Sequence, residues 1–234
     1  DGAPVGVLLS GGLDSSIIAA LAVKVKGEPL PTFSVGAAGS PDLLQARKVA
    51  QFIGSEHHEY VYDETDLEEI LPDVIYYLES YDAGLVPSSL GNFLVSRLAA
   101  EHGCNVVLSG EGADELFAGY AYMKKIPEAQ GLEDELAQRL QCMHNVGCQR
   151  IDRMNAAHSI EVRVPFLERE VINFTQTLPA EWKLHGEEKV EKWILRQAFA
   201  GKDILPAEVV WRVKQPFNEG CGSTDLLANY VDRQ

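Results

Sequence analysis

The chain has 234 residues, of which 46% are hydrophobic and 24% are charged, a composition typical of a globular protein with a sizeable core. Its 20 basic and 35 acidic side chains give a formal charge of −15, which disfavours nucleic-acid partners because an acidic surface repels phosphate backbones. The sequence contains no run of about 18 apolar residues, so it predicts no membrane-spanning segment.

The cysteines of the chain point to a cytoplasmic setting, whereas the start of the chain says little about localisation. The chain begins at Asp1 without an initiator Met or an apolar leader, which indicates a processed chain or a piece of a longer one. The cysteines are Cys104, Cys142, Cys148 and Cys221. None forms a C-x-x-C pair, and although two of them flank His144, a zinc site needs a fourth ligand and paired spacing. We expect free or buried thiols in a reducing compartment.

The first half of the chain alternates strand and helix patterns. Residues 5–10 are a short apolar run ending in glycines, which suits a strand buried on both faces, and residues 15–25 follow as a helix. Residues 31–36 predict a second strand. Ser40 then supplies an N-cap, with Pro41 at the first helical position of a helix that ends before Gly54.

The pattern continues with a third strand over residues 57–62 and helices over residues 66–81 and 89–101. We interpret residues 82–88, between the two helices, as an irregular segment. Residues 105–109 predict a fourth buried strand that again ends in a glycine-rich turn.

This alternation predicts an α/β fold with an open, doubly wound parallel sheet. Beyond Tyr120 the pattern becomes mostly helical, which predicts a helical C-terminal lobe. We expect a single domain, with an α/β nucleotide-binding part over about residues 1–122 and the helical lobe over about residues 123–234.

The turn after the first strand, residues 10–16, reads Ser-Gly-Gly-Leu-Asp-Ser-Ser. Its glycines let backbone N–H groups converge on an anion, and the following helix adds the positive end of its dipole. The turn lacks the lysine and the spacing of the common G-x-x-x-x-G-K-[ST] phosphate loop. Because Asp14 would repel a polyphosphate, its presence here predicts bound Mg²⁺. A merely structural turn capped by Asp and Ser is the weaker alternative.

A second turn with the same setting covers residues 109–115, Ser-Gly-Glu-Gly-Ala-Asp-Glu. Ligands of parallel sheets bind beyond the carboxyl ends of the strands, so both turns should open onto one crevice. Asp114 is a candidate second ligand of Mg²⁺, and Glu111 is a candidate general base. We interpret Glu115 as an acid that caps the next helix.

Five strings, in order, resemble one known family. The 10–16 turn resembles that of the N-type ATP pyrophosphatases, and residues 109–120 resemble the synthetase domain of glutamine-dependent asparagine synthetases. Residues 33–36 (Phe-Ser-Val-Gly), 161–168 (Glu-Val-Arg-Val-Pro-Phe-Leu-Glu) and 211–217 (Trp-Arg-Val-Lys-Gln-Pro-Phe) agree. The resemblance extends from Val5 to about Gly222 and implies an adenine nucleotide alpha hydrolase-like fold.

The resemblance implies a role for each matching residue. The residues that would hold pyrophosphate are Ser10, Gly11, Gly12, Asp14, Ser15 and Ser16. Those that would line the nucleotide are Leu8, Val35, Ser109 and Gly110. Asp14 and Asp114 would bind Mg²⁺, Glu111 would lie near the incoming nitrogen, and Lys214 would stabilise charge on the phosphate.

The implied activity is that of an AMP-forming carbon–nitrogen ligase, asparagine synthetase-like, with ATP and Mg²⁺. It would adenylate a carboxylate, with aspartate favoured, release pyrophosphate, and transfer ammonia or an amine to give an amide. The chemistry agrees, because attack on the α-phosphate builds negative charge that Mg²⁺ and a lysine can offset.

Two departures from the family pattern leave alternatives open. The chain has no N-terminal glutaminase domain with a cysteine nucleophile, so truncation, free ammonia, an amine substrate or a separate glutaminase or ammonia-delivering subunit all stay open. In place of a Thr-x-Arg element that holds aspartate in one branch, residues 84–88 read Gly-Leu-Val-Pro-Ser. A substrate other than aspartate, as in a β-lactam or peptide cyclase, is therefore also open. A degenerate nucleotide-binding subunit is a further alternative, and the sequence leaves open whether the protein is a homo-oligomer.

Overall fold

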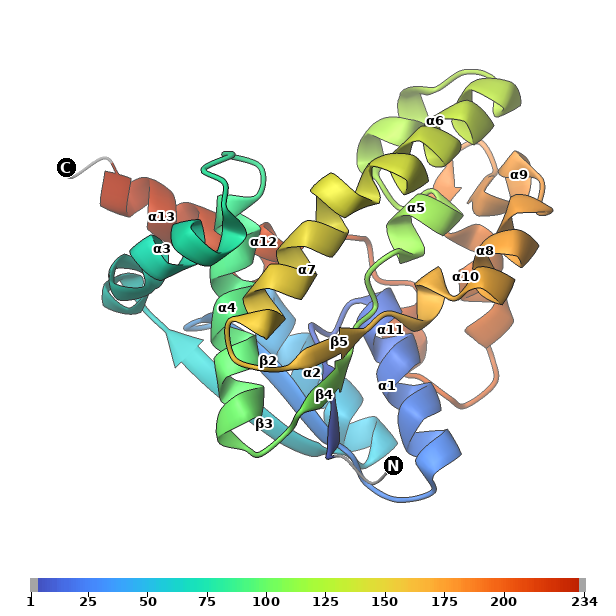
Figure 1. Ribbon diagram of the computed structural model, residues 1–234. Helices are drawn as coiled ribbons and strands as arrows, with labels where there is room; N and C mark the ends of the chain where they lie inside the picture. The colour runs from blue at the N-terminus through green and yellow to red at the C-terminus, as the bar shows by residue number, and fades with distance from the viewer. Residues whose placement is uncertain (1–3, 232–234) are drawn as a thin grey trace.

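The computed structural model describes residues 4–231, and within them five parallel strands form an open sheet in the order β3-β2-β1-β4-β5 (Figure 1). The strands are β1 (Val5–Leu8), β2 (Pro31–Ala37), β3 (Glu56–Tyr62), β4 (Val106–Leu108) and β5 (Glu161–Arg163). The chain moves outward from β1 to β3 and then returns to the other side of β1. The order therefore reverses between β1 and β4, the place where parallel sheets bind ligands.

Helices cover both faces of the sheet. Those of the first half are α1 (Leu13–Lys26), α2 (Pro41–Ile53), α3 (Glu64–Leu78), α4 (Val86–Glu101) and α5 (Ala113–Phe117). Those of the second half are α6 (Ala129–Cys142), α7 (Gly147–Ala156), α8 (Arg169–Gln176), α9 (Ala180–Lys183), α10 (Trp193–Phe199), α11 (Ala207–Val210), α12 (Phe217–Gly220) and α13 (Ser223–Val231). Short 3₁₀ helices cover Ala121–Lys125, Met143–Asn145 and Pro165–Leu167, and β6 (Leu184–His185) pairs with β7 (Val190–Glu191).

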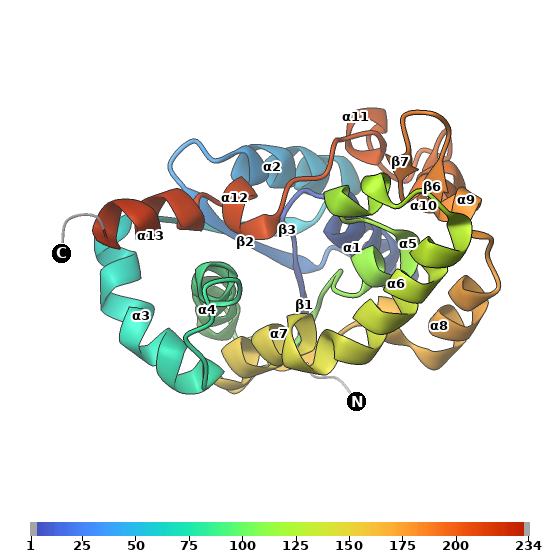
Figure 2. The ribbon, with the colours of Figure 1, turned by 90° about the horizontal axis from the view of Figure 1, so that it is seen from above.

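Each face of the sheet has its own core. Val7 packs on the side of α1 and α2, whereas its neighbour Leu8 packs on the side of α4, as alternation along a strand requires. Seen from above, β2 lies between α2 and α4 (Figure 2). The prediction of an α/β, doubly wound parallel sheet is confirmed.

The predicted strands and helices of the first half are present, with their ends shifted by a few residues. Ser40 precedes α2, Pro41 begins it, and Gly54 ends it in the left-handed conformation. One prediction was wrong: the last three residues of the segment 82–88 belong to α4. The Asp82 carboxylate accepts hydrogen bonds from the N–H groups of Gly84 and Leu85, and this turn leads directly into the helix.

The strand β5 is not predicted by the sequence pattern. Its three residues pair with β4, in the register Val106 opposite Glu161 and Leu108 opposite Arg163, and the Ser109 N–H donates to the Arg163 carbonyl at 2.9 Å. A strand this short has no measurable alternation, and both of its end residues are exposed at the sheet edge. The second half of the chain therefore contributes an edge strand to the same sheet.

All four cysteines lie among the described residues and are free thiols, as expected. Within residues 4–231, no helix is both long enough and apolar enough to cross a membrane.

Candidate active site

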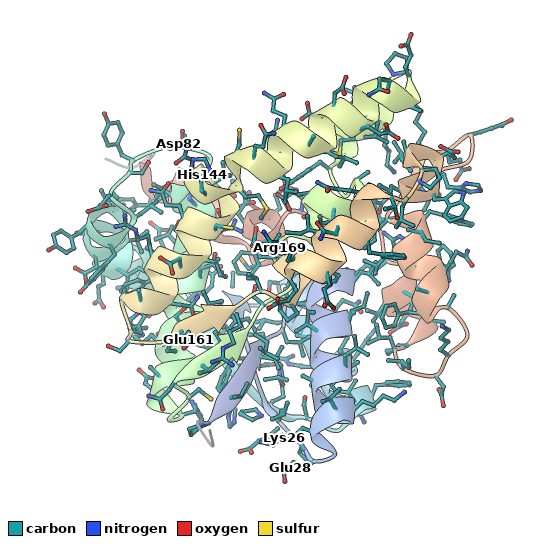
Figure 3. All side chains as sticks on the ribbon, turned by 45° about the vertical axis from the view of Figure 1, so that its right-hand side comes forward. Lys26, Glu28, Asp82, His144, Glu161 and Arg169 are labelled. Carbon is teal, nitrogen blue, oxygen red and sulfur yellow. The ribbon has the colours of Figure 1, made fainter. Side chains whose placement is uncertain are left out.

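A cavity of about 460 Å³ opens at the carboxyl ends of β1, β2 and β4. Both glycine-rich turns line it, together with residues 212–218 of the C-terminal part. Helix α1 starts at Leu13, which lines the cavity. Figure 3 shows Lys26 and Glu28, at the far end of α1, on the lower edge of the molecule, whereas Asp82, close to the cavity-lining Gly84, lies on the upper edge. Helix α1 therefore begins at the cavity and runs away from it, with its positive end toward any bound anion.

The cavity gathers most of the predicted site residues, although they come from separate parts of the chain. The predicted residues that line it are Leu8, Ser10, Gly12, Asp14, Ser15, Val35, Ser109, Gly110, Glu111, Asp114 and Lys214. Gly11 and Ser16 lie behind this lining, where Gly11 packs against α2 and the Ser16 side chain is fully buried. The expectation that both turns open onto one crevice is confirmed.

The first turn is already shaped in the structure. The Ser15 hydroxyl accepts a hydrogen bond from the Ser10 N–H at 3.2 Å, donates to the Gly12 carbonyl at 3.3 Å, and lies 3.0 Å from the Ser10 hydroxyl. The N–H groups at the start of α1 have no partner within the helix. These donors and hydroxyls form a cradle suited to phosphate oxygens.

The two turns touch each other. A Cβ on Gly110 would lie 2.7 Å from both the Asp14 carbonyl carbon and the Ser15 nitrogen, closer than side chains approach backbone. Any side chain at position 110 would therefore push the second turn away from the first.

Gly11 and Gly12 should respond differently to the same substitution. Gly11 has φ +72°, and its Cβ would lie 2.5 Å from the Ala46 nitrogen, whereas the Cβ of Gly12 would meet only the Ser10 hydroxyl at 3.4 Å. We expect Gly11→Ala to lower the free energy of unfolding by about 2 kcal/mol or more, and Gly12→Ala to change it far less. Urea denaturation of both variants tests this, and equal losses would contradict it.

Four charged side chains meet between the two turns. The Lys192 Nζ pairs with Asp14 Oδ2 and lies 2.6 Å from Asp114 Oδ1, while the Lys214 Nζ pairs with Asp114 Oδ2. Lys192 is only 1% exposed, so its charge is balanced entirely inside the protein. The result is an alternating cluster of two cations and two carboxylates beside the phosphate cradle.

The ionisation of this cluster follows from its pairing. Burial opposes the charge of Lys192, but Asp114 and Asp14 outweigh it and hold the pKa of Lys192 above its usual value. Burial likewise opposes the charge of Asp114, but Lys192 and Lys214 outweigh it and hold the pKa of Asp114 well below its usual range. Both groups are therefore charged at neutral pH.

Lys192 was missed by the sequence analysis. It precedes α10 in a left-handed backbone conformation, φ 56°, and its N–H donates to the Phe117 carbonyl at 3.1 Å. Non-glycine residues in this region are strained and often mark functional sites. No local motif surrounds Lys192 in the sequence, because its acidic partners lie 178 and 78 positions away along the chain.

The two glutamates of the second turn have different surroundings. The Glu111 Oε2 lies 2.7 Å from the Arg150 Nη2, and a Cβ on Gly147 would lie 2.4 Å from Glu111 Oε1. Arg150, which the sequence analysis also missed, therefore orients the Glu111 carboxylate. Glu115 is not a helix cap: the N-cap of α5 is Gly112, and the buried Glu115 accepts a hydrogen bond from the Tyr120 hydroxyl.

Residues 211–216, here called the strap, link α11 to α12 across the first turn. The Arg212 guanidinium donates to the Gly11 carbonyl at 3.1 Å and to Asp42 Oδ1 at 2.9 Å. The strap also brings Lys214 to Asp114. The family string at residues 211–217 therefore lies directly against the string at residues 10–16.

Asp42 should make stability depend on pH. Burial raises the pKa of Asp42 from 3.8 to about 6, although Arg212 pulls in the opposite direction. Because the folded state then binds this proton more tightly than the unfolded state, ionisation of Asp42 costs stability above pH 6, and the cost is relieved on acidification. Between pH 7 and pH 5 the wild type should gain about 1 kcal/mol relative to Asp42→Asn. Urea denaturation at both pH values measures this, and a constant difference would contradict it.

Asp14 and Asp114 could hold Mg²⁺ together with a nucleotide. Asp14 Oδ1 is buried and accepts no hydrogen bond, so it has a free lone pair for a cation. Among the described residues, no three His, Cys, Asp or Glu side chains form a metal-binding group. Mg²⁺ usually takes one or two carboxylates and completes its shell with substrate phosphates and water, so the two aspartates fit that pattern.

Comparison with known proteins gives consistent matches along the chain. The asparagine synthase family model matches residues 1–138 and 123–234. The glutamine-hydrolyzing asparagine synthetase of Gallus gallus is 41% identical over 241 residues, which cover 98% of this chain and 43% of that protein. The glutamine-hydrolyzing asparagine synthetase 2 of Arabidopsis thaliana is 38% identical over 232 residues, which cover 94% of this chain and 40% of that protein. The chain thus spans less than half the length of these curated relatives.

Among solved structures, the NMN synthetase from Francisella tularensis is similar with a TM-score of 0.37 and 17% identity, over 75% of this chain and 84% of that one. The NAD⁺ synthetase from Burkholderia pseudomallei has a TM-score of 0.32 and 13% identity, over 99% of this chain and 82% of that one.

Proposed function

The chain belongs to the asparagine synthase family, and we propose that it is an AMP-forming amide ligase that uses Mg-ATP to activate a carboxylate. Aspartate is the favoured acid, and asparagine the favoured product. The observation that carries the proposal is the meeting of both glycine-rich turns with Lys192 and Lys214 in one cavity. In this proposal, about residues 1–122 bind the nucleotide, and the remainder supplies the two lysines.

The nucleotide would occupy the cavity with its phosphates on the first turn. Ser10, Ser15 and the start of α1 would hold the departing pyrophosphate, and Leu8, Val35, Ser109 and Gly110 would line the rest of the nucleotide. Mg²⁺, when bound with ATP, would offset phosphate charge from a position near Asp14 and Asp114. Lys192 and Lys214, which already lie beside Asp14 and Asp114, would offset the remaining charge.

Two bond exchanges complete the proposed reaction. A carboxylate oxygen of the acid attacks the α-phosphorus, and pyrophosphate leaves with the electrons of the broken P–O bond. Ammonia or an amine then attacks the acyl carbon and expels AMP, and the nitrogen loses one proton. Glu111 is the proposed acceptor of that proton, with Arg150 holding its carboxylate in place.

The acid would lie beside α4. Gly84, Leu85, Ser88 and Asn92 line the cavity there. Residues 84–88 contain no arginine, so aspartate as the substrate depends on the family relationship and not on a matching arginine. A β-lactam or peptide cyclase acting on another acid is therefore the second candidate.

The proposal extends to the nitrogen source and the cellular setting. The named relatives are glutamine-hydrolyzing, so ammonia here would come from a glutaminase, either on a longer form of this chain or on a separate subunit. The four free thiols suit a reducing, cytoplasmic location. A homo-oligomer is compatible with this proposal.

Pyrophosphate release tests the function directly. The purified chain is incubated with Mg-ATP, ammonium and one acid at a time, and both pyrophosphate and AMP are followed. Release that depends on aspartate supports the proposal, and release that depends only on other acids supports the cyclase alternative. A folded sample that releases none with any acid would overturn the ligase assignment and leave a nucleotide-binding subunit.

A further inference from the structure

Arg196, on α10, is almost completely buried and makes contacts in three directions. Its Nε donates to the Glu191 carbonyl at 2.8 Å, and its Nη2 lies 2.5 Å from Glu191 Oε1. Its Nη1 donates to the carbonyls of Val210, at 2.6 Å, and Arg212, at 3.0 Å. All three guanidinium nitrogens are therefore engaged by protein acceptors.

These contacts join the two segments that carry the cavity lysines. Glu191 immediately precedes Lys192, and the carbonyls of Val210 and Arg212 belong to the end of α11 and the strap that leads to Lys214. Backbone carbonyls bound by a rigid, planar guanidinium have little freedom to shift. One buried side chain thus ties the backbone beside Lys192 to the strap that carries Lys214.

We infer that Arg196 is a positioning residue that sets the reach of Lys214 toward Asp114 and the phosphates. The inference rests on the proposed ligase function and assigns a role to a side chain that has no match among the family strings. Arg196 borders the cavity but is only 2% exposed, and four of its five N–H donors already bind protein acceptors, so it is poorly placed to bind a phosphate itself. It acts on the reaction through the strap.

Arg196→Lys is the sharpest test, because it keeps the charge but loses the planar guanidinium that binds three backbone carbonyls. We expect the turnover number for acid-dependent pyrophosphate release to fall up to about 100-fold, because small misplacements of a charge-stabilising group have effects of that size. The KM for ATP should stay within about threefold, since no residue of the cradle that binds the phosphates is replaced.

A double-mutant comparison separates positioning from general stability. If Arg196 works through Lys214, then Arg196→Lys should add less than about threefold to the loss caused by Lys214→Ala. Val74→Ala, in a fully buried position of α3, is the matched control, because it should lower stability without changing turnover. Multiplicative losses in the double variant, or full turnover in Arg196→Lys, would overturn the inference.

A milder variant covers the case in which Arg196→Lys does not fold. Glu191→Gln keeps the shape of the side chain that binds Arg196 but removes its charge. Turnover should therefore fall by a smaller factor than in Arg196→Lys, with the KM for ATP unchanged. Unchanged turnover in a folded Glu191→Gln would overturn the inference. A wild type that releases no pyrophosphate overturns the ligase function itself, whereas an active wild type with fully active variants overturns only the role of Arg196.

Discussion

Asp14→Asn is expected to reduce acid-dependent pyrophosphate release by about 100-fold to 1000-fold while the protein stays folded. Asp14 lies in the first turn of α1, where one carboxylate oxygen pairs with Lys192 and the other is buried without a hydrogen-bond partner. The asparagine keeps the shape but has no negative charge with which to hold a cation against the phosphates. Lys192 would still have Asp114 as its partner, so the fold should survive.

The measurement needs a control that also removes an acid from the start of a helix. Asp225 occupies the first turn of α13, is exposed, and lies outside the cavity lining. Asp225→Asn should therefore leave pyrophosphate release unchanged while removing the same formal charge. Near-normal turnover in Asp14→Asn, with a circular dichroism spectrum equal to that of the wild type, would contradict the metal-binding role of Asp14.

The sequence predicted the parts of the site that are local. The turn at residues 10–16 contains its glycines, serines and acid within one strand-to-helix connection, so its chemistry can be read without knowing the fold. The same holds for residues 109–115. That both turns meet followed from the general rule for parallel sheets, and the cavity that they share bears the expectation out.

The residues that were missed act through contacts between distant parts of the chain. Arg150 meets Glu111 across 39 positions, and Lys192 meets Asp14 across 178. A lone lysine or arginine in a helical region has no periodic or spacing signal, because its function depends on which loop it reaches after folding. The strand β5 was not predicted for a different reason, because three residues at a sheet edge are too few to show an alternation of apolar and polar side chains.

Lys192→Met should have the second large effect, and it should appear in stability as well as in turnover. Removing a fully buried cation leaves the carboxylates of Asp14 and Asp114 close together with only Lys214 to balance them. Breaking a buried pair in this way typically costs about 3–5 kcal/mol of unfolding free energy. Pyrophosphate release should fall as well, because a cation beside the phosphate cradle is lost.

The pH dependence of this loss has a definite sign. Lys192 holds the pKa of Asp114 below its usual value of 3.8, so the pairing stabilises the fold at neutral pH and is lost as the pH falls through the depressed pKa. In Lys192→Met the pKa of Asp114 should rise, and protonation should then relieve the repulsion at a higher pH. The stability difference between wild type and variant should therefore be largest near neutrality and smaller in acid.

Lys183 offers a matched comparison, because it is also a buried lysine. In Lys183 the effect of burial on the pKa outweighs that of nearby acids, whereas in Lys192 the acids outweigh burial. Lys183 is 5% exposed, and burial lowers its pKa, so its charge is poorly compensated. Lys183→Met should therefore be neutral or stabilising, whereas Lys192→Met should be strongly destabilising at pH 7. Urea denaturation of both variants at pH 7 and pH 4 decides the matter. If the two substitutions change the free energy of unfolding equally, then Lys192 does not hold Asp14 and Asp114 together. The proposal that Lys192 lies beside the phosphates would then lose its physical basis.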